Sequence, residues 1–180
     1  AEESERQSAY RSYLQKNEAL LQQRQAICRE RLLRQYPSTP ELVQKLTGGQ
    51  AAEVLWNRNA RAEDFTTVRL GLGRMDISSM IRTPAVRFSI RSDELEEQPA
   101  KLKADYQTIL QIPSLLCIGQ HKLTGIIGEQ ARVQEVVRNI VLQLAMLHSY
   151  TDVRLIGLFR EGEQELFSWL RWLPHVFSPD

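Results

Sequence analysis

Apolar residues at the start of the chain recur every seven positions, in two rows that lie side by side. The rows are Tyr13, Leu20 and Ile27, and next to them Leu14, Leu21 and Cys28. They form one apolar face on an otherwise polar segment, which predicts a single long helix over residues 2–35. Asn17, Arg24 and Arg31 interrupt a third row. The helix is therefore expected to pack on its own domain, or to form a loose hairpin, rather than a strong coiled coil.

Proline residues set the helix boundaries in the segment that follows. Pro37 is expected to end the first helix, because it disfavours the helical conformation at the residue before it. Thr39 is the expected N-cap of a short helix that runs through Leu46. A further short helix is predicted over residues 51–56.

The period then changes from helical to alternating. Alternation over residues 67–73 predicts a half-buried strand, and residues 86–90 predict a second strand. Residues 94–110 predict a helix, with Pro99 in its first turns or breaking it.

The C-terminal part predicts a strand, a helix and another strand in succession. Residues 115–118 and 123–127 are expected to form a hairpin, and residues 129–149 a long helix with one apolar face. Residues 153–159 are almost continuously apolar, as parallel strands buried on both faces tend to be. Residues 163–172 predict a last helix. The βαβ unit over 123–159 implies at least one parallel pair and the α/β class.

Composition narrows the class of protein. The chain has 180 residues, of which 42% are apolar and 25% charged, as in soluble globular proteins. Lys and Arg total 23 against 22 Asp and Glu, so charge does not favour nucleic acid as a partner. No apolar run approaches the ~20 residues of a membrane span. Cys28 and Cys117 are interpreted as reduced thiols in a cytosolic setting.

The turn between the predicted strand 123–127 and the following helix is where an α/β nucleotide-binding fold holds a phosphate. Gly125 and Gly128 supply the flexible turn, but Glu129 and Arg132 follow where a phosphate loop has Lys and Ser or Thr. A carboxylate at Glu129 suits the positive end of the helix and repels a phosphate there. The turn is interpreted as a degenerate phosphate-loop position.

The companion features of catalysis are missing too. The predicted strand 153–159 ends without the acid that would hold Mg²⁺, because Asp152 stands at its other end. His121, His148 and His175 show no metal-ligand spacing. We therefore expect no catalytic residue, no metal and no bound cofactor in this chain.

Aromatic and arginine residues suggest an interface, because both are enriched at interaction hot spots. The candidates are Trp56, Arg58, Trp169, Arg171, Trp172 and His175. An equally good interpretation is that they pin helices onto the sheet.

At these motifs the chain resembles a known family. The landmarks, in chain order, are Tyr10-Arg11, Tyr13-Leu14, Tyr36-Pro37, Leu55-Trp56-Asn57-Arg58, Asp64-Phe65, residues 68–73, His148-Ser149, Asp152-Val153 and residues 169–175. Their order and near-complete coverage resemble the segment after the transmembrane helices of the membrane-bound ATPase of type VII secretion systems. That ATPase is the EssC/EccC-type member of the FtsK/SpoIIIE family.

The resemblance implies a fold and an organisation. It implies a Rossmann-like or P-loop-ATPase-like sheet with flanking helices and a degenerate site, over residues 61–180. Residues 1–60 become a helical stalk toward the membrane with short helices after it. The implied location is the cytoplasmic face of the bacterial membrane, which the basic residues of the first helix suit.

The resemblance also implies partners and a function. This segment would be a non-catalytic domain coupling the membrane part to downstream ATPase modules of the same chain, where ATP and Mg²⁺ bind. Other membrane components of the secretion system would be partners, and secreted helical-hairpin effectors indirect ones. The full-length protein is expected to be an ATP-hydrolysing translocase and a higher oligomer. The rival hypotheses are a weak ATPase domain with a non-standard phosphate loop, and DNA translocation, against which the near-neutral charge argues.

Overall fold

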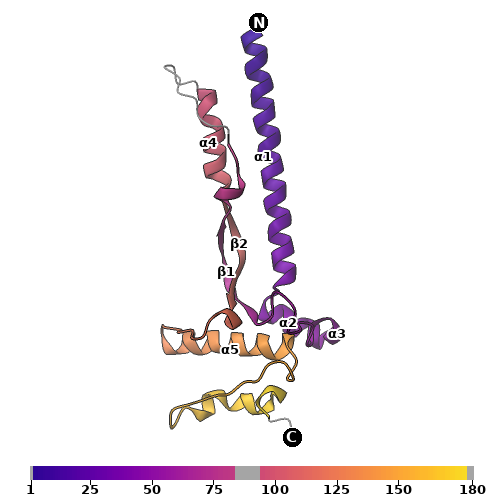
Figure 1. Ribbon diagram of the computed structural model, residues 1–180, viewed down its shortest axis with the longest axis vertical. Coiled ribbons are helices and arrows are strands. Elements are labelled where there is room, and N and C mark those ends of the chain that lie inside the picture. Colours follow the sequence, from indigo (N-terminus) through magenta and orange to yellow (C-terminus); the bar gives the residue numbers. More distant parts are fainter. Residues whose placement is uncertain (1, 84–93, 178–180) are drawn as a thin grey trace. The chain divides into compact units, whose positions relative to one another are not determined.

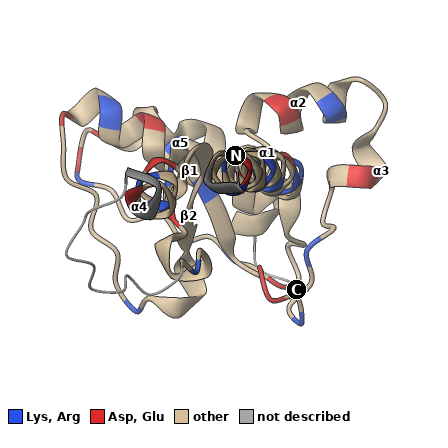
Figure 2. Ribbon diagram, turned by 90° about the horizontal axis from the view of Figure 1, so that it is seen from above, with Lys and Arg blue, Asp and Glu red and all other residues tan. Residues whose placement is uncertain are grey.

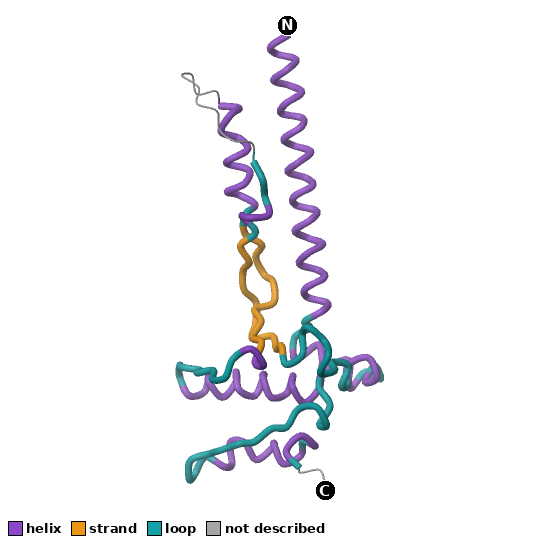
Figure 3. The backbone as a smooth tube through the Cα atoms, in the orientation of Figure 1, coloured by secondary structure: helices purple, strands orange, loops and turns teal. Residues whose placement is uncertain are grey.

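The computed structural model describes residues 2–83 and 94–177 and shows a mixture of helices and strands (Figures 1 and 3). Its helices are α1 (Glu2–Gln35), α2 (Thr39–Thr47), α3 (Ala51–Val54), α4 (Glu94–Tyr106) and α5 (Gln130–Leu147). Its strands are β1 (Thr67–Asp76) and β2 (Thr108–Cys117). Short 3₁₀ helices are η1 (Ser78–Met80), η2 (Ile118–Gln120), η3 (Gln164–Trp172) and η4 (Pro174–Val176).

The chain forms two compact units. The first contains residues 1–35 and 72–114, and the second contains residues 36–71 and 115–180. The division into domains over residues 1–60 and 61–180 stays a prediction.

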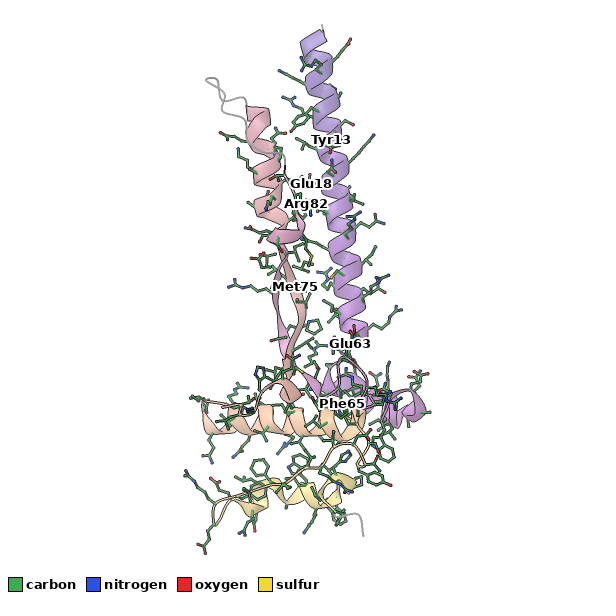
Figure 4. The ribbon with its side chains drawn as sticks, in the orientation of Figure 1. Tyr13, Glu18, Glu63, Phe65, Met75 and Arg82 are labelled. Atoms are coloured by element: carbon green, nitrogen blue, oxygen red, sulfur yellow. The ribbon has the colours of Figure 1, made fainter. Side chains whose placement is uncertain are left out.

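In the first unit, α1 packs along α4 and against the ends of the two strands. Its core gathers apolar residues that lie far apart in sequence: Ile77, Ile109 and Ile112, with Cys28, Leu32, Met75 and Ile81 at its edge. The Tyr106 hydroxyl donates to Glu18 of α1 over 2.9 Å and accepts a bond from Gln22 over 2.6 Å (Figure 4). Polar and apolar contacts together therefore hold α1 and α4 side by side.

The long helix is confirmed over Glu2–Gln35, but only half of its apolar face is covered. Leu14, Leu21 and Cys28 are half-buried, whereas Tyr13, Leu20 and Ile27 remain exposed.

The predicted helix over 94–110 is too long. It ends at Tyr106, and Thr108–Cys117 is a strand instead. Ile109 is buried as expected, but as a strand residue, and Leu110 is exposed rather than in the core. The reason is pairing with β1, which is antiparallel: the Ile77 N–H donates to the Gln107 carbonyl and the Ile118 N–H to the Thr66 carbonyl.

In the second unit, α2 and α3 pack on the C-terminal part of α5. The core there consists of Leu42, Val54, Met146 and Leu147, with Leu46 and Leu142 against it. The N-cap of α2 is Ser38, one residue earlier than predicted. The Glu41 carboxylate accepts bonds from the Ser38 N–H and hydroxyl, and these bonds lower the pKa of Glu41. Helix α2 carries Glu41 in its first turn and Lys45 in its last turn, coloured red and blue in Figure 2.

The predicted parallel unit over 123–159 does not form in the described residues. Helix α5 is confirmed, but residues 123–127 and 153–159 are loop (Figure 3). The partner of β2 is β1, so the predicted hairpin of 115–118 with 123–127 is also wrong. A strand needs a neighbour for its backbone groups, and neither segment has a strand beside it here. The predicted strand over 86–90 lies outside the described residues.

The last predicted helix, over 163–172, is a 3₁₀ helix with a kink at Phe167.

Candidate functional site

The carbonyl groups at the C-terminal end of α5 are all hydrogen-bonded. The last four carbonyls of a helix lack partners within the helix. Here the Leu144 carbonyl accepts from the His148 backbone N–H, and Ala145 from the indole N–H of Trp56 over 3.3 Å. The Met146 and Leu147 carbonyls accept from the backbone N–H groups of Trp56 and Arg58, over 2.9 and 3.0 Å. The segment Leu55–Arg58 therefore caps a helix that lies far from it in sequence.

Trp56 is held in an unusual backbone conformation to make these bonds. Its φ of 55° lies in the left-handed region, which is uncommon for a bulky residue. Its ring meets Tyr150 edge-on, with centroids 5.4 Å apart. The strain is compensated by two hydrogen bonds to the helix end and by this aromatic contact.

Arg58 is a buried cation with several partners. Its guanidinium donates to the Thr67 carbonyl, lies 3.4 Å from the Asp64 carboxylate, and stacks over the Tyr36 ring at 5.1 Å. Burial lowers the pKa of Arg58, and the Asp64 charge opposes that change. The same burial raises the pKa of Tyr36. Arg58 thus ties the loop, the start of β1 and the residue after α1 together.

His148 follows α5 directly and is fully buried. Its Nε2 accepts the Thr66 backbone N–H over 3.0 Å, so that nitrogen carries no proton. Its Nδ1 lies 3.2 Å from the Leu144 carbonyl and must be the donor there. Phe65, which is labelled in Figure 4, packs edge-on against the His148 ring, with the ring centroids 5.2 Å apart. Burial lowers the pKa of His148, and the bond to Leu144 only partly offsets it.

His175 is the second fully buried histidine. Its Nε2 lies 2.8 Å from the His148 carbonyl and donates to it. Its Nδ1 is buried without a hydrogen-bond partner among the described residues. The His175 carbonyl accepts the Leu155 N–H over 3.0 Å, so the residue fastens two C-terminal segments to the end of α5.

Two amide side chains attach β1 to the middle of α5. The side chain of Gln143 accepts the Arg69 backbone N–H over 2.8 Å and donates to the Arg69 carbonyl over 2.7 Å. Asn139 donates to the same carbonyl over 2.9 Å. Gln143 therefore pairs with a strand residue as a neighbouring backbone would.

The N-terminal end of α5 carries the predicted degenerate phosphate corner, and it is open. Residues 119–132 are all exposed. Glu129 is the N-cap, and its carbonyl accepts the first helical bond from Val133 over 2.9 Å. Arg132 pairs with Glu135 over 3.1 Å, and Gly125 and Gly128 lie in the loop before the helix. The corner therefore offers an exposed helix start with a carboxylate at its first position.

The predicted interface residues fall into two groups. Trp56, Arg58 and His175 meet at the C-terminal end of α5, where each has an intramolecular role. Arg171 and Trp172 are exposed and contact each other, with the guanidinium 5.2 Å from the ring centroid. The indole nitrogen of the half-buried Trp169 is itself buried, and no partner for it lies within the described ranges.

Two important residues at this site, Thr66 and Gln143, escaped the sequence reasoning, because no motif marks them. Asp64 was noted only as a landmark of the resemblance. The signal for Gln143 was its place among the apolar positions of a helix, where a polar residue needs a buried partner.

Comparisons with known proteins confirm the resemblance. The chain is 28% identical over 97% of its length to the ESX secretion system protein EccC of Geobacillus thermodenitrificans, and 24% identical over 98% to YukB of Bacillus subtilis. It is 26% identical over 95% to the type VII secretion system protein EssC of Staphylococcus aureus. The chain spans only 11–12% of the length of these relatives. No family model matches it.

Within residues 2–83 and 94–177, no helix has both the length and the apolar character needed to cross a bilayer. Over the same ranges, no three His, Cys, Asp or Glu residues gather as a metal site would require.

We predict that Arg58→Lys destabilises the second unit by about 2 kcal/mol, because a lysine cannot serve Thr67, Asp64 and the Tyr36 ring together. All three tryptophans of the chain lie in this unit, so urea unfolding followed by tryptophan fluorescence reports on it. Arg61→Lys, at an exposed position of the same loop, is the matched control and should leave the midpoint unchanged. Equal midpoints for the two variants would contradict the role given to Arg58.

Proposed function

We propose that this chain is a non-catalytic, ATPase-like coupling domain of a type VII protein secretion system. The supporting observation is that the two ends of α5 differ in how they are bonded. Its C-terminal end is tied to three other segments, whereas its N-terminal end has Glu129 at the position that a bound phosphate would need. A helix held this way can transmit displacement, but its start lacks the lysine and the Ser or Thr hydroxyl of a phosphate loop.

The similarity to EccC, YukB and EssC supports a role in secretion. In the proposed role, α1 is the stalk toward the membrane, on its cytoplasmic side. The residues after η3 lead toward ATPase modules of the same protein, where ATP and Mg²⁺ act. The whole protein is then a translocase, active as a higher oligomer with other membrane components of the system. Its cargo would be small helical-hairpin proteins.

The finer fold in this proposal is a Rossmann-like or P-loop-like sheet completed by further residues of a longer protein. The support is the exposure of the two loops that flank α5. Leu123 and Ile127 are 91% and 100% exposed, and Ile156 and Leu158 are 87% and 93% exposed. Burying such a side chain stabilises a fold by roughly 1.5–3 kcal/mol. Four exposed apolar side chains in these two loops favour segments that become strands when they pair with strands from another part of the protein.

Hydrogen exchange tests the completed sheet. In a protein that also carries the sequence after residue 180, the amides of residues 123–127 and 153–159 should exchange at least tenfold more slowly than in the 180-residue chain. The amides of Val68 to Leu70 in β1 should be protected in both proteins and serve as the control. Equally fast exchange of the two loops in both proteins would count against the sheet.

The coupling role predicts that a change on an exposed surface can lower secretion without unfolding the domain. Trp172 is 76% exposed, and in the full-length protein Trp172→Ala should lower secretion several-fold while the fold and the ATPase activity of the other modules persist. Met80→Ala removes an equally exposed apolar side chain (76%) from η1 of the first unit and is the matched control, which should secrete normally. Normal secretion by the Trp172 variant would remove this surface from the proposal.

The alternative is a weak nucleotide-binding domain, favoured by the open start of α5 after Gly128. The coupling proposal predicts that Mg-ATP leaves the melting temperature of the chain unchanged. A ligand-dependent rise that Glu129→Arg strengthens and Arg132→Ala abolishes would instead establish nucleotide binding. Glu135→Ala, which frees Arg132 without changing the corner itself, separates the two contributions.

A further inference from the structure

We propose that His148 and His175 form a latch that fastens the loop before β1 and the C-terminal segment to the end of α5, and that protonation of His148 opens it. This inference is independent of the proposed function, because it rests only on contacts within the second unit.

The loop side of the latch depends on a neutral imidazole. The Thr66 N–H points at the Nε2 of His148 over 3.0 Å. A proton on Nε2 would set two donors against each other at that distance, and the bond would be lost. The Nδ1 cannot compensate, because it already donates to the Leu144 carbonyl.

Thr66 is a strained residue that this bond helps to hold. Its φ is 60°, in the left-handed region that β-branched residues avoid. The Thr66 hydroxyl accepts the Gly119 N–H, and the Thr66 carbonyl accepts the Ile118 N–H. Loss of the His148 bond therefore loosens both the start of β1 and the turn after β2.

The C-terminal side of the latch runs through the backbone of His148. Its carbonyl accepts the Nε2–H of His175, and the His175 carbonyl accepts the Leu155 N–H. Arg154 adds a bond to the Phe177 carbonyl. A shift of His148 away from Thr66 is thus passed to the two segments that close over the end of α5.

The surroundings of His148 decide how it responds to acid. The charged and titratable groups that face it are Arg58 and Asp64 on the loop and His175 on η4. Burial, Arg58 and His175 all disfavour the charged ring, and Asp64 favours it. Because the pKa of His148 is lowered in the folded state, an unfolded or open state takes up the proton first. Stability from the latch is complete above pH ~6.5 and falls as the pH drops toward the lowered pKa.

The test is hydrogen exchange at the amides of Thr66 and Leu155, expressed as protection factors between pH 7.5 and pH 5. With one proton taken up on opening, protection should fall by up to about tenfold per pH unit below pH ~6.5. His148→Gln keeps an acceptor for Thr66 but cannot titrate, so its protection should not change with pH. His121→Gln, at an exposed histidine of the same unit, should behave as the unmodified chain does. Protection that stays constant in the unmodified chain, or falls equally in His148→Gln, would overturn the latch.

A ring measurement keeps the proposal falsifiable if His148→Gln does not fold. In ¹⁵N NMR spectra of the unmodified chain at pH 7.5, His148 should be the Nδ1–H tautomer and His175 the Nε2–H tautomer. Protonation of His148 should coincide with the loss of protection at Thr66. A His148 ring that carries a proton on Nε2 while Thr66 remains protected would refute the proposal.

Discussion

The structure of the second unit depends on how the carbonyl groups at the C-terminal end of α5 are hydrogen-bonded. Residues 143–148 are buried, so the carbonyls that a helix leaves free at its end cannot turn to water. The segment Leu55–Arg58 donates to three of them, and His148 donates to the fourth. Once these bonds are made, the positions of Arg58, Thr66 and His175 follow, because each is bonded to the capping residues or to His148.

The attachment of β1 to α5 follows a related principle. A strand edge needs partners for its N–H and carbonyl groups, and these usually come from another strand. At Arg69 both groups are bonded by the Gln143 side chain, with Asn139 as an additional donor. A helix thereby takes the place of a third strand at one residue. These bonds anchor the start of β1, residues 67–71, within the second unit.

The sequence was informative where structure is decided locally and misleading where it is decided by distant partners. Helices α1, α2 and α5 were predicted because their apolar spacing and their punctuation are local features. The first part of β2 was missed, although a strand was predicted over 115–118, because Ile109 and Leu110 continue the helical spacing of Leu102 and Tyr106. Only pairing with β1 makes them strand residues. The two loops beside α5 have the composition of buried strands, but composition cannot supply a neighbour. Trp56, Arg58 and His175 stood out in the sequence, whereas their meeting at one helix end depends on contacts between distant segments.

Several landmarks of the resemblance that lie in the second unit have a common physical role at this helix end. Trp56 and Arg58 cap it, Asp64 and Phe65 contact Arg58 and His148, and His175 bonds to the carbonyl of His148. None of them lies at the phosphate corner, at the opposite end of the same helix. These landmark residues of the second unit therefore fix α5 in place, and they are not residues that a nucleotide would contact. A packed interior moves in discrete steps rather than by smooth deformation. The proposed coupling role requires a helix that can move between two positions, and the latch proposed at His148 would let this end of α5 do so.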